Sequence, residues 1–304
     1  DFERHEIVVR NPAVPRESPW LAIARAAGAR IEMEMTLFFR ACPAPIIGVT
    51  GTKGKTTTAT LCAAILRQWR PDTVLAGNLG RSALEALPAI RPDTPVVLEL
   101  SSWQLEGLDE HGLSPHIAVL TTISPDHLDR YPSFEAYVDA KRAIARHQRP
   151  DDWFVVNRDD PVAWSCRSAG VARIVPFGRD DGTSEGAFWE GDRLLWRFAG
   201  NETELLRRSE FPLAGQHAVY DALAAAAAAL LRGAAPLHAR IGLTTAQPVP
   251  HRLERVATID GVEFVNDTAA TAPAAVLAAL EAFADRPMQR LVEMPDDELQ
   301  DVRP

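Results

Sequence analysis

Cysteine is scarce in this 304-residue sequence, and long apolar runs do not occur in it. The three cysteines, Cys42, Cys62 and Cys166, are scattered and odd in number, so they offer neither a disulfide framework nor metal-ligand spacing. This usage favours a reducing compartment, and we expect a cytoplasmic protein. No apolar run approaches the length that crosses a membrane, because the alanine-rich stretch at 222–230 is short and follows Asp221. We therefore expect no membrane insertion.

Blocks of basic residues are absent as well. The formal net charge is −9, and no run of Lys and Arg of the nucleic-acid-binding type occurs, so we expect no nucleic-acid partner. No internal repeat is visible. The length predicts two domains, or three small ones.

Apolar runs of strand length alternate with helical patterns along most of the chain. Before about residue 42, the pattern predicts strands at 6–9 and near Ile31, with a helix at 20–27 between them. Further strands are predicted at 46–50, 73–77, 95–100, 116–122, 153–157 and 172–177, and helices at 56–69, 82–90, 133–147, 160–169 and 215–232. This alternation indicates an α/β fold with a mostly parallel sheet covered by helices.

Two hairpins and a boundary complete the predicted organisation. Residues 188–206 predict a hairpin near the sheet edge that turns at Gly191-Asp192. Pro248 and Pro250 indicate a domain boundary, after which a second hairpin turns at Asp260-Gly261 and a helix covers 273–283. We expect domains at 1–42, 43–248 and 249–304.

The segment GVTGTKGKTTTATLCAAILRQW, residues 48–69, combines a strand, a glycine-rich turn and a helix. A helix N-terminus presents unpaired N–H groups to an anion, and Gly51 and Gly54 allow the backbone to approach phosphates closely. The spacing departs from the common phosphate-loop rule, because Val49 occupies the place of its first glycine. We interpret the segment as a nucleotide site, with a tight turn alone as the alternative.

Three polar or charged residues lie next to apolar segments, where a buried core would not need them. Glu99 ends an apolar strand, at the edge where open α/β sheets bind ligands, so a cation or backbone capping could compensate its charge. His127, between Asp126 and Asp129, follows another strand and is either a ligand or an ordinary loop residue. Lys141 lies on a largely apolar helix face, where a lysine usually extends its amine to water.

Several segments together resemble one known family. GVTGTKGKTTT, GNLG, LELSSWQLE, DHLDRYPSFEAYVDAKRAI, PHRLERV and VNDTAATAP are similar, in this order, to the motifs of the Mur ligases. The string from Glu99 to Glu106 is most similar to the member that adds D-glutamate to UDP-N-acetylmuramoyl-L-alanine. The resemblance runs from about residue 6 to 287.

The resemblance implies an ATP-dependent acid–amino-acid ligase of peptidoglycan synthesis, which serves cell-wall biogenesis, cell shape and cell division. It implies ATP, two Mg²⁺ sites, a cytoplasmic monomer, and UDP-N-acetylmuramoyl-L-alanine and D-glutamate as substrates. Residues 1–42 would be part of a UDP-substrate domain, 43–248 a central ATP-binding ligase domain, and 249–304 part of an amino-acid-binding domain. The reaction would pass through an acyl phosphate.

Roles for individual residues follow from the same resemblance. The implied catalytic set is Lys55, Glu99, His127 and Lys141, with Lys141 carbamylated by CO₂ because burial favours its neutral, reactive amine. Metal ligands would be Thr56, Glu99, His127 and Lys141. ATP would contact Gly51, Thr52, Lys53, Gly54, Lys55, Thr56 and Thr57, with Arg252 at the γ-phosphate and Asp267 at the ribose. The muramoyl substrate would contact Asn78, Ser101, Gln104 and His127.

Some positions depart from the family pattern. Lys53 replaces the usual asparagine, Ala269 a lysine, Ala218 and Asp221 asparagines, and Ala13 a glycine. The alternative function is therefore a catalytically silent Mur-ligase-like module that binds nucleotide, and a third interpretation is an ordinary phosphate-loop ATPase. We also expect the sequence to be incomplete near its start and around Pro287. Met288-Gln289-Arg290 begins a charged tail where the family continues with a strand.

Overall fold

The computed structural model describes residues 4–79, 82–180, 182, 184–268, 270 and 273–283. The chain divides into two compact units. One contains Asp1–Leu213 and His217–Pro250, and the other Ala214–Gln216 and His251–Pro304. Gly80, Ala269 and the predicted tail from Met288 lie outside the described residues.

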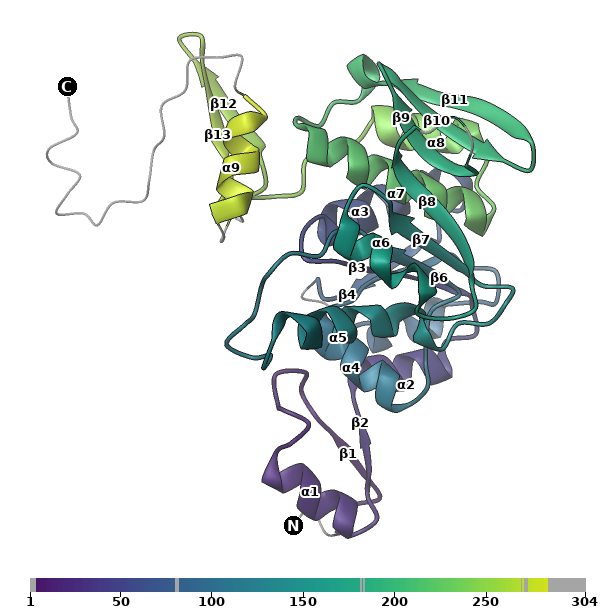
Figure 1. Cartoon of the computed structure of the whole chain (residues 1–304), viewed down its shortest axis with the longest axis vertical. Helices are drawn as coiled ribbons and strands as arrows, with labels where there is room; N and C mark the ends of the chain where they lie inside the picture. The colour runs from purple at the N-terminus through teal and green to yellow at the C-terminus, as the bar shows by residue number, and fades with distance from the viewer. Residues whose placement is uncertain are drawn as a thin grey trace, which may run out of the picture. The chain divides into compact units, whose positions relative to one another are not determined.

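The described part of the first unit is built on one nine-stranded sheet (Figure 1). The strand order is β11-β10-β9-β8-β7-β6-β3-β5-β4. The parallel strands are β3 (Ile46–Thr50), β4 (Val74–Gly77), β5 (Val96–Glu99), β6 (Ile117–Leu120), β7 (Trp153–Asn157), β8 (Arg173–Arg179) and β9 (Gly186–Glu190), and β10 (Arg193–Phe198) and β11 (Asn201–Arg207) are antiparallel additions. The predicted α/β class with a mostly parallel sheet is confirmed.

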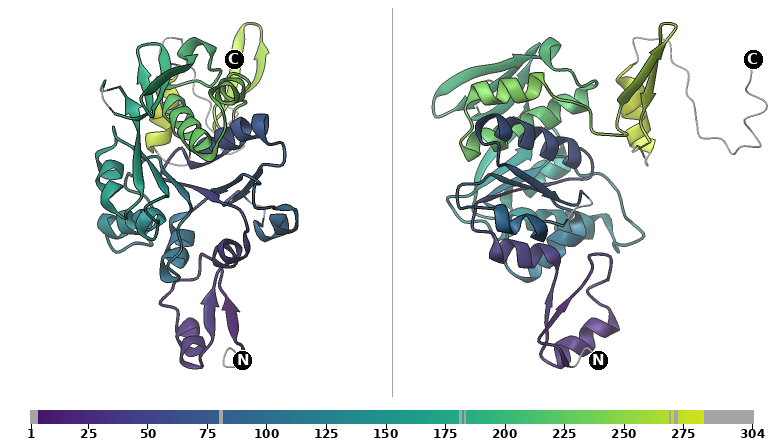
Figure 2. Two further views of the ribbon diagram at one scale, coloured as in Figure 1. Left: turned by 90° about the vertical axis from the view of Figure 1, so that its right-hand side faces the viewer. Right: turned by 180° about the vertical axis from the view of Figure 1, so that it is seen from behind.

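Helices cover both faces of this sheet, as the two further views in Figure 2 also show. On one face lie α3 (Lys55–Trp69), α7 (Gln216–Arg232) and α8 (Pro236–Thr244), and on the other α2 (Glu34–Ala41), α4 (Ser102–Glu110), α5 (Phe134–Arg146) and α6 (Pro161–Ser165). Side chains of a strand alternate between the faces, so Val97 packs under α3 and α7 whereas Val96 and Leu98 pack under α4 and α5. Burial of β5 on both faces explains why its sequence is apolar throughout.

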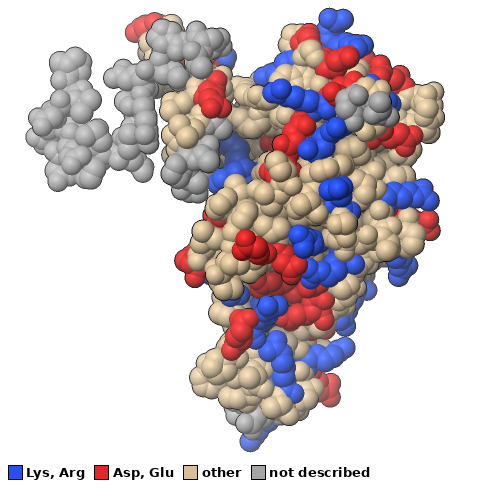
Figure 3. All heavy atoms as spheres, viewed as in Figure 1, with Lys and Arg blue, Asp and Glu red and all other residues tan. Residues whose placement is uncertain are grey.

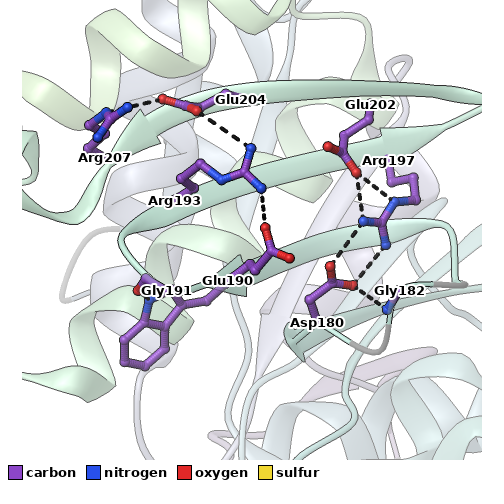
Figure 4. A network of polar contacts seen from close by, with 10 residues as sticks. Asp180, Gly182, Glu190, Gly191, Arg193, Arg197, Glu202, Glu204 and Arg207 are labelled. Carbon is purple, nitrogen blue, oxygen red and sulfur yellow. Dashed lines mark hydrogen bonds and ion pairs between the residues drawn. The ribbon is translucent and has the colours of Figure 1, made fainter.

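The antiparallel end of the sheet is held by charged pairs (Figure 4). Arg197 on β10 donates to Asp180 at 2.8 Å and to Glu202 on β11 at 2.7 Å. The predicted turn at Gly191-Asp192 joins β9 to β10, and the chain then adds β11 as a further strand after Gly200. Over the face drawn in Figure 3, acidic and basic side chains are interspersed.

The segment before α2 forms a small parallel pair of strands with one helix. β1 (Ile7–Val9) pairs with β2 (Arg30–Glu32), and α1 (Pro19–Ala26) connects them. Their own apolar cluster is small, consisting of Leu21, Ala24, Ala29 and Ile31. The nearly buried Arg10 lies with Nη2 3.8 Å from Glu110 Oε1 on α4, and His111 Nε2 is 2.8 Å from the carbonyl oxygen of Ile31.

The described part of the second unit is a hairpin and a helix. β12 (Glu254–Ile259) pairs antiparallel with β13 (Val262–Asn266), as the turn at Asp260-Gly261 predicted, and α9 spans Pro273–Glu281. The domain boundaries expected at residues 42 and 248 stay predictions.

Two predicted helices are wrong in type or length. Residues 82–90 contain a 3₁₀ helix at Leu84–Ala89 in place of an α-helix, because Pro88 lacks an N–H and disfavours continued α-helix. The helix predicted at 160–169 ends at Ser165 and continues as a 3₁₀ turn at Cys166–Ser168; a further 3₁₀ turn lies at Arg208–Glu210. The sequence patterns also missed α2, α4 and α8. Within the described ranges, no helix is long and apolar enough to cross a membrane.

Candidate active site

The carboxyl ends of four neighbouring parallel strands meet at one edge of the sheet. In the order β6-β3-β5-β4, these ends lead into the loop with His127, the glycine-rich loop, Glu99 and Asn78. Ligands of open α/β sheets bind at this kind of edge. The strand order therefore brings together segments that lie up to 76 positions apart, from Gly51 to His127.

The glycine-rich loop adopts a conformation that depends on its glycines. Gly54 is the N-cap of α3 with φ of 85°, and an added Cβ there would lie 2.2 Å from Asp221 Oδ1. A Cβ on Gly51 would lie 1.9 Å from Thr121 Oγ1. Lys55 Nζ donates to the carbonyl oxygens of Gly51 and Thr52 at 3.0 and 2.9 Å, so its charge stays at the loop. A loop that is only a turn would not require a cation held at the start of a helix.

Gly54→Ala should weaken nucleotide binding and stability together. The left-handed backbone costs a non-glycine residue about 1–2 kcal/mol, and the new methyl group would also displace Asp221. Gly112→Ala is the matched control, because Gly112 has φ of 64° but no atom within 4 Å of its Cβ position. Calorimetry with a Mg²⁺-nucleoside triphosphate should show affinity at least about tenfold lower for Gly54→Ala only. An equal loss in the control would contradict the role of the loop.

Glu99 is 2% exposed and is held by two side chains from neighbouring loops. Thr56 Oγ1, in the first turn of α3, donates to Glu99 Oε2 at 2.7 Å, and Asn78 Nδ2 donates to Oε1 at 3.2 Å. The capping alternative proposed backbone donors, whereas the observed donors are neutral side chains that leave the negative charge uncompensated. The oxygens of Thr56 and Glu99 therefore lie side by side, as ligands of one hard cation would.

Lys141 is 2% exposed, so its amine does not extend to water as lysines on apolar faces usually do. Burial lowers the pKa of Lys141 well below its usual value, and the nearby charge of Lys55 lowers it further. Asp126 and Glu99 act in the opposite direction. The fold therefore favours the neutral amine of Lys141. Lys55 of the phosphate loop and Glu99 are close enough for their charges to shift its pKa.

Tyr137, one helical turn before Lys141, connects the lysine to the phosphate loop. Lys141 Nζ lies 4.7 Å from the centre of the Tyr137 ring, and the Tyr137 hydroxyl lies 3.1 Å from Thr52 Oγ1. Burial raises the pKa of Tyr137 to about 12, although the bond to Thr52 acts against the shift. Tyr137 belongs to the largely apolar helix face that carries Lys141, and its spacing of four residues from Lys141 is the signal that the sequence offers.

His127 lies on the loop between β6 and α5 in a left-handed conformation, with φ of 51°. Its side chain is 48% exposed, with Nε2 3.8 Å from Asp126 Oδ2, and its ring centre lies 5.7 Å from that of Trp103 and 6.3 Å from that of Tyr137. His127 and Lys141 therefore both lie against Tyr137. The exposed part of the His127 side chain remains accessible to a ligand.

Ser101 and Gln104 contact each other at the start of α4. Ser101 Oγ accepts from the Gln104 backbone N–H at 3.3 Å, and Gln104 Oε1 accepts from the Ser101 backbone N–H at 2.9 Å. This is a capping box, which satisfies the helix end without a ligand. Substrate contact by these residues stays a prediction.

The remaining predicted positions fall in different places. Asp267 Oδ1 accepts from the Leu253 N–H at 3.0 Å within the second unit, which also holds Arg252, and their contact with nucleotide stays a prediction. Asp221 is 6% exposed and accepts from Thr58 Oγ1 at 3.2 Å, so this departure from the family pattern lies beneath the phosphate loop. Ala218 is buried in α7 and Ala13 is exposed.

Among the residues that the structure describes, no three His, Cys, Asp or Glu side chains form a cluster able to hold a metal ion. The expected ligand set contains Thr56 and Lys141 besides one Glu and one His, so it does not depend on such a cluster. Mg²⁺ commonly takes one or two protein ligands, with water and substrate phosphates completing its octahedron. The Thr56–Glu99 pair fits that requirement.

Residues 49–229 match the family model described as the Mur ligase middle domain. The chain belongs to the Mur ligase family. A UDP-N-acetylmuramoylalanine–D-glutamate ligase of Roseiflexus sp. (strain RS-1) is 54% identical over 300 residues, which cover 94% of this chain and 63% of that protein. The ligase of the same name from Symbiobacterium thermophilum is 44% identical, and the match covers 91% of this chain and 60% of that protein. The chain thus spans about three fifths of the length of these relatives.

Solved Mur ligase structures share the fold. The crystal structure of MurF from Acinetobacter baumannii matches with a TM-score of 0.67 and 20% identity, over 94% of this chain and 70% of that one. A UDP-N-acetylmuramoyl-L-alanyl-D-glutamate–2,6-diaminopimelate ligase matches with a TM-score of 0.63 and 21% identity, over 93% of this chain and 69% of that one. The fold of this chain is therefore the fold of these Mur ligase structures.

Proposed function

We propose that this Mur ligase adds D-glutamate to UDP-N-acetylmuramoyl-L-alanine at the expense of ATP, as part of peptidoglycan precursor synthesis. The observation that carries the proposal is the convergence of Lys55, the Thr56–Glu99 pair and buried Lys141 at one sheet edge. An ordinary phosphate-loop ATPase has no need for a buried lysine there. The curated relatives named for this activity support the choice of D-glutamate as the amino acid.

The chemistry that such a site must perform begins with two anions. A carboxylate is a poor electrophile, so the alanine carboxylate takes the γ-phosphoryl group of ATP and becomes an acyl phosphate. The amine of D-glutamate then attacks the acyl carbon, the C–N bond forms and inorganic phosphate leaves. Positive charge must be fixed where the phosphates lie, because catalysis of phosphoryl transfer is mostly positioning and electrostatic stabilisation.

The residues of this chain divide that work between them. Lys55 and the N–H groups at the start of α3 would hold the phosphates, with Gly51, Thr52, Lys53, Gly54 and Thr57 completing the cradle. Thr56 and Glu99 would hold one Mg²⁺, and His127 and carbamylated Lys141 a second. When bound, Mg²⁺ neutralises charge on the transferred phosphoryl group. Asn78, Ser101 and Gln104 would contact the muramoyl substrate, and Arg252 and Asp267 the nucleotide.

Carbamylation of Lys141 is supported by its burial. CO₂ adds to a neutral amine, and the fold buries the Lys141 side chain and lowers its pKa. The product is an anion that could face Mg²⁺ where an ammonium group would repel it. The proposal extends to a cytoplasmic, monomeric enzyme.

The substrate dependence of ADP release tests the function. In the native protein with Mg-ATP, release should require both UDP-N-acetylmuramoyl-L-alanine and D-glutamate. Release without either substrate would indicate an ATPase, and nucleotide binding without release would indicate a catalytically silent module. Either result would overturn the proposal.

A further inference from the structure

One partly buried ion pair joins the loop of His127 to the helix that follows Glu99. Arg130 Nη2, on the loop between β6 and α5, lies 3.6 Å from Glu106 Oε2 on α4. The side chains are 20% and 10% exposed. Arg130 Nε and Nη2 and Glu106 Oε2 have no hydrogen-bond partner among the described residues. A partly buried ion pair whose facing atoms lack hydrogen bonds contributes little to stability, so stability alone does not account for it.

The backbone of Arg130 belongs to the turn that contains His127. The N–H groups of Arg130 and Tyr131 both donate to the His127 carbonyl oxygen, at 2.9 and 3.1 Å. These bonds close the turn in which His127 has its left-handed φ of 51°. Because the His127 side chain is about half exposed, few side-chain contacts fix its position. Its place depends on the turn, and the turn is tied to α4 through Arg130.

Tyr131 extends the same connection toward Lys141. It is 6% exposed and packs edge-to-face on Tyr137, with ring centres 5.3 Å apart. Tyr137 in turn contacts Thr52 and Lys141, as described above. Displacing the Arg130 turn would therefore shift Tyr131 and His127 together.

The surroundings argue that Arg130 serves the protein rather than an anionic ligand. Arg130 and Glu106 line a cavity of about 320 Å³. The other charged residues in its lining are Arg16, Glu17, Asp109 and Asp139. Four carboxylates against two guanidinium groups make this cavity acidic, so Glu106 is the counter-charge available to Arg130.

We propose that Arg130 and Glu106 are positioning residues, which hold the His127 loop against α4 in the geometry that the reaction needs. The inference rests on the proposed ligase function for its kinetic test. Arg130→Gln and Glu106→Gln should each lower kcat about 10- to 100-fold, the usual range for residues that orient metal ligands. Nucleotide affinity should stay near that of the unchanged protein. The double variant should lose little more than either single variant, because the two residues act as one unit.

Arg146→Gln is the matched control. Arg146 on α5 pairs with Asp109 on the same helix α4 at 2.6 Å, with exposure similar to that of Arg130, but does not contact the His127 loop. This control should keep kcat even where it lowers the thermal midpoint. Arg130→Lys, which retains the charge, should recover part of the lost rate.

Hydrogen exchange gives a readout that does not require ligase activity. Arg130→Gln should accelerate exchange of the Arg130 and Tyr131 amides, which donate to His127, and Arg146→Gln should not. If the native protein proves inactive, the proposed function fails while this exchange test still decides the positioning role. Unchanged exchange in Arg130→Gln, or an equal loss of kcat in Arg146→Gln, would overturn the inference.

Discussion

Lys141→Ala should abolish ligation, with a rate loss of at least about a hundredfold, and leave nucleotide affinity largely intact. The reason is that Lys141 lies against the ring of Tyr137, whose hydroxyl group contacts the phosphate loop, and would act through a carbamate on the second metal. Kinetics with saturating ATP and a separate calorimetric measurement of ATP binding would distinguish the two effects. Short carboxylates added to Lys141→Ala should restore part of the rate. Wild-type turnover in this variant would contradict the role.

Lys141→Met should at the same time raise the thermal midpoint of the protein. The fold disfavours a charged amine at this position, and methionine fills a similar volume without one. Gain of stability with loss of activity is expected where a functional group is strained by its surroundings. The chain has three lysines, Lys53, Lys55 and Lys141, so a carbamate signal from ¹³CO₂ in NMR can be assigned by its loss in Lys141→Met. A lower midpoint would indicate a structural role for the amine.

Glu99→Ala should cost more in catalysis than in nucleotide affinity. Magnesium that Glu99 would hold should act most strongly on charge that develops during phosphoryl transfer, which is a transition-state effect. The expected loss of kcat is about a hundredfold or more. Glu99→Gln keeps an acceptor for the Thr56 hydroxyl group and a similar side-chain shape. Comparing it with Glu99→Ala therefore distinguishes the effect of the lost negative charge from the effect of the lost side chain.

Parallel measurements of kcat and of ATP affinity decide this prediction. Both Glu99 variants should lose rate, and Glu99→Gln should keep the thermal midpoint of the unchanged protein. Equal losses in affinity and rate, with a lower midpoint, would assign Glu99 a folding role instead.

Local patterns predicted the elements that carry the site. The glycine-rich loop follows an apolar strand and opens a helix, and each of these signals lies within about twenty residues. Glu99 and His127 were found because polar residues at strand ends are unusual among apolar neighbours. Parallel strands then place such ends at one edge, whatever their separation in sequence.

Two of the three missed helices, α4 and α8, contain a glycine with a packing role. A Cβ on Gly107 in α4 would lie 2.6 Å from Met33 Sδ, and one on Gly242 in α8 would lie 2.7 Å from the Ile65 Cα. Glycine lowers helix propensity, yet here it permits close approach of another segment. Tertiary packing, which a single sequence does not display, therefore determines both helices.

The burial of the Lys141 side chain could not be predicted from the sequence pattern of its helix. Spacing placed it on the apolar face of α5, where the usual behaviour of lysine favours an exposed amine. Its burial depends on Tyr137 and on elements distant in sequence, including the phosphate loop. The Arg130–Glu106 pair was equally invisible, since the two residues lie in separate motifs and the resemblance assigns a role to neither of them.

Transfer of isotope from D-glutamate into a UDP-linked product tests the central claim most directly. The native protein is incubated with Mg-ATP, UDP-N-acetylmuramoyl-L-alanine and labelled D-glutamate. The nucleotide products are then separated and quantified by mass spectrometry. If the protein is the proposed ligase, a labelled UDP-linked product should form in equal amount with ADP and phosphate. The same product should be missing when Lys141→Ala is used. ADP formation without label in any UDP-linked product would contradict the proposed function.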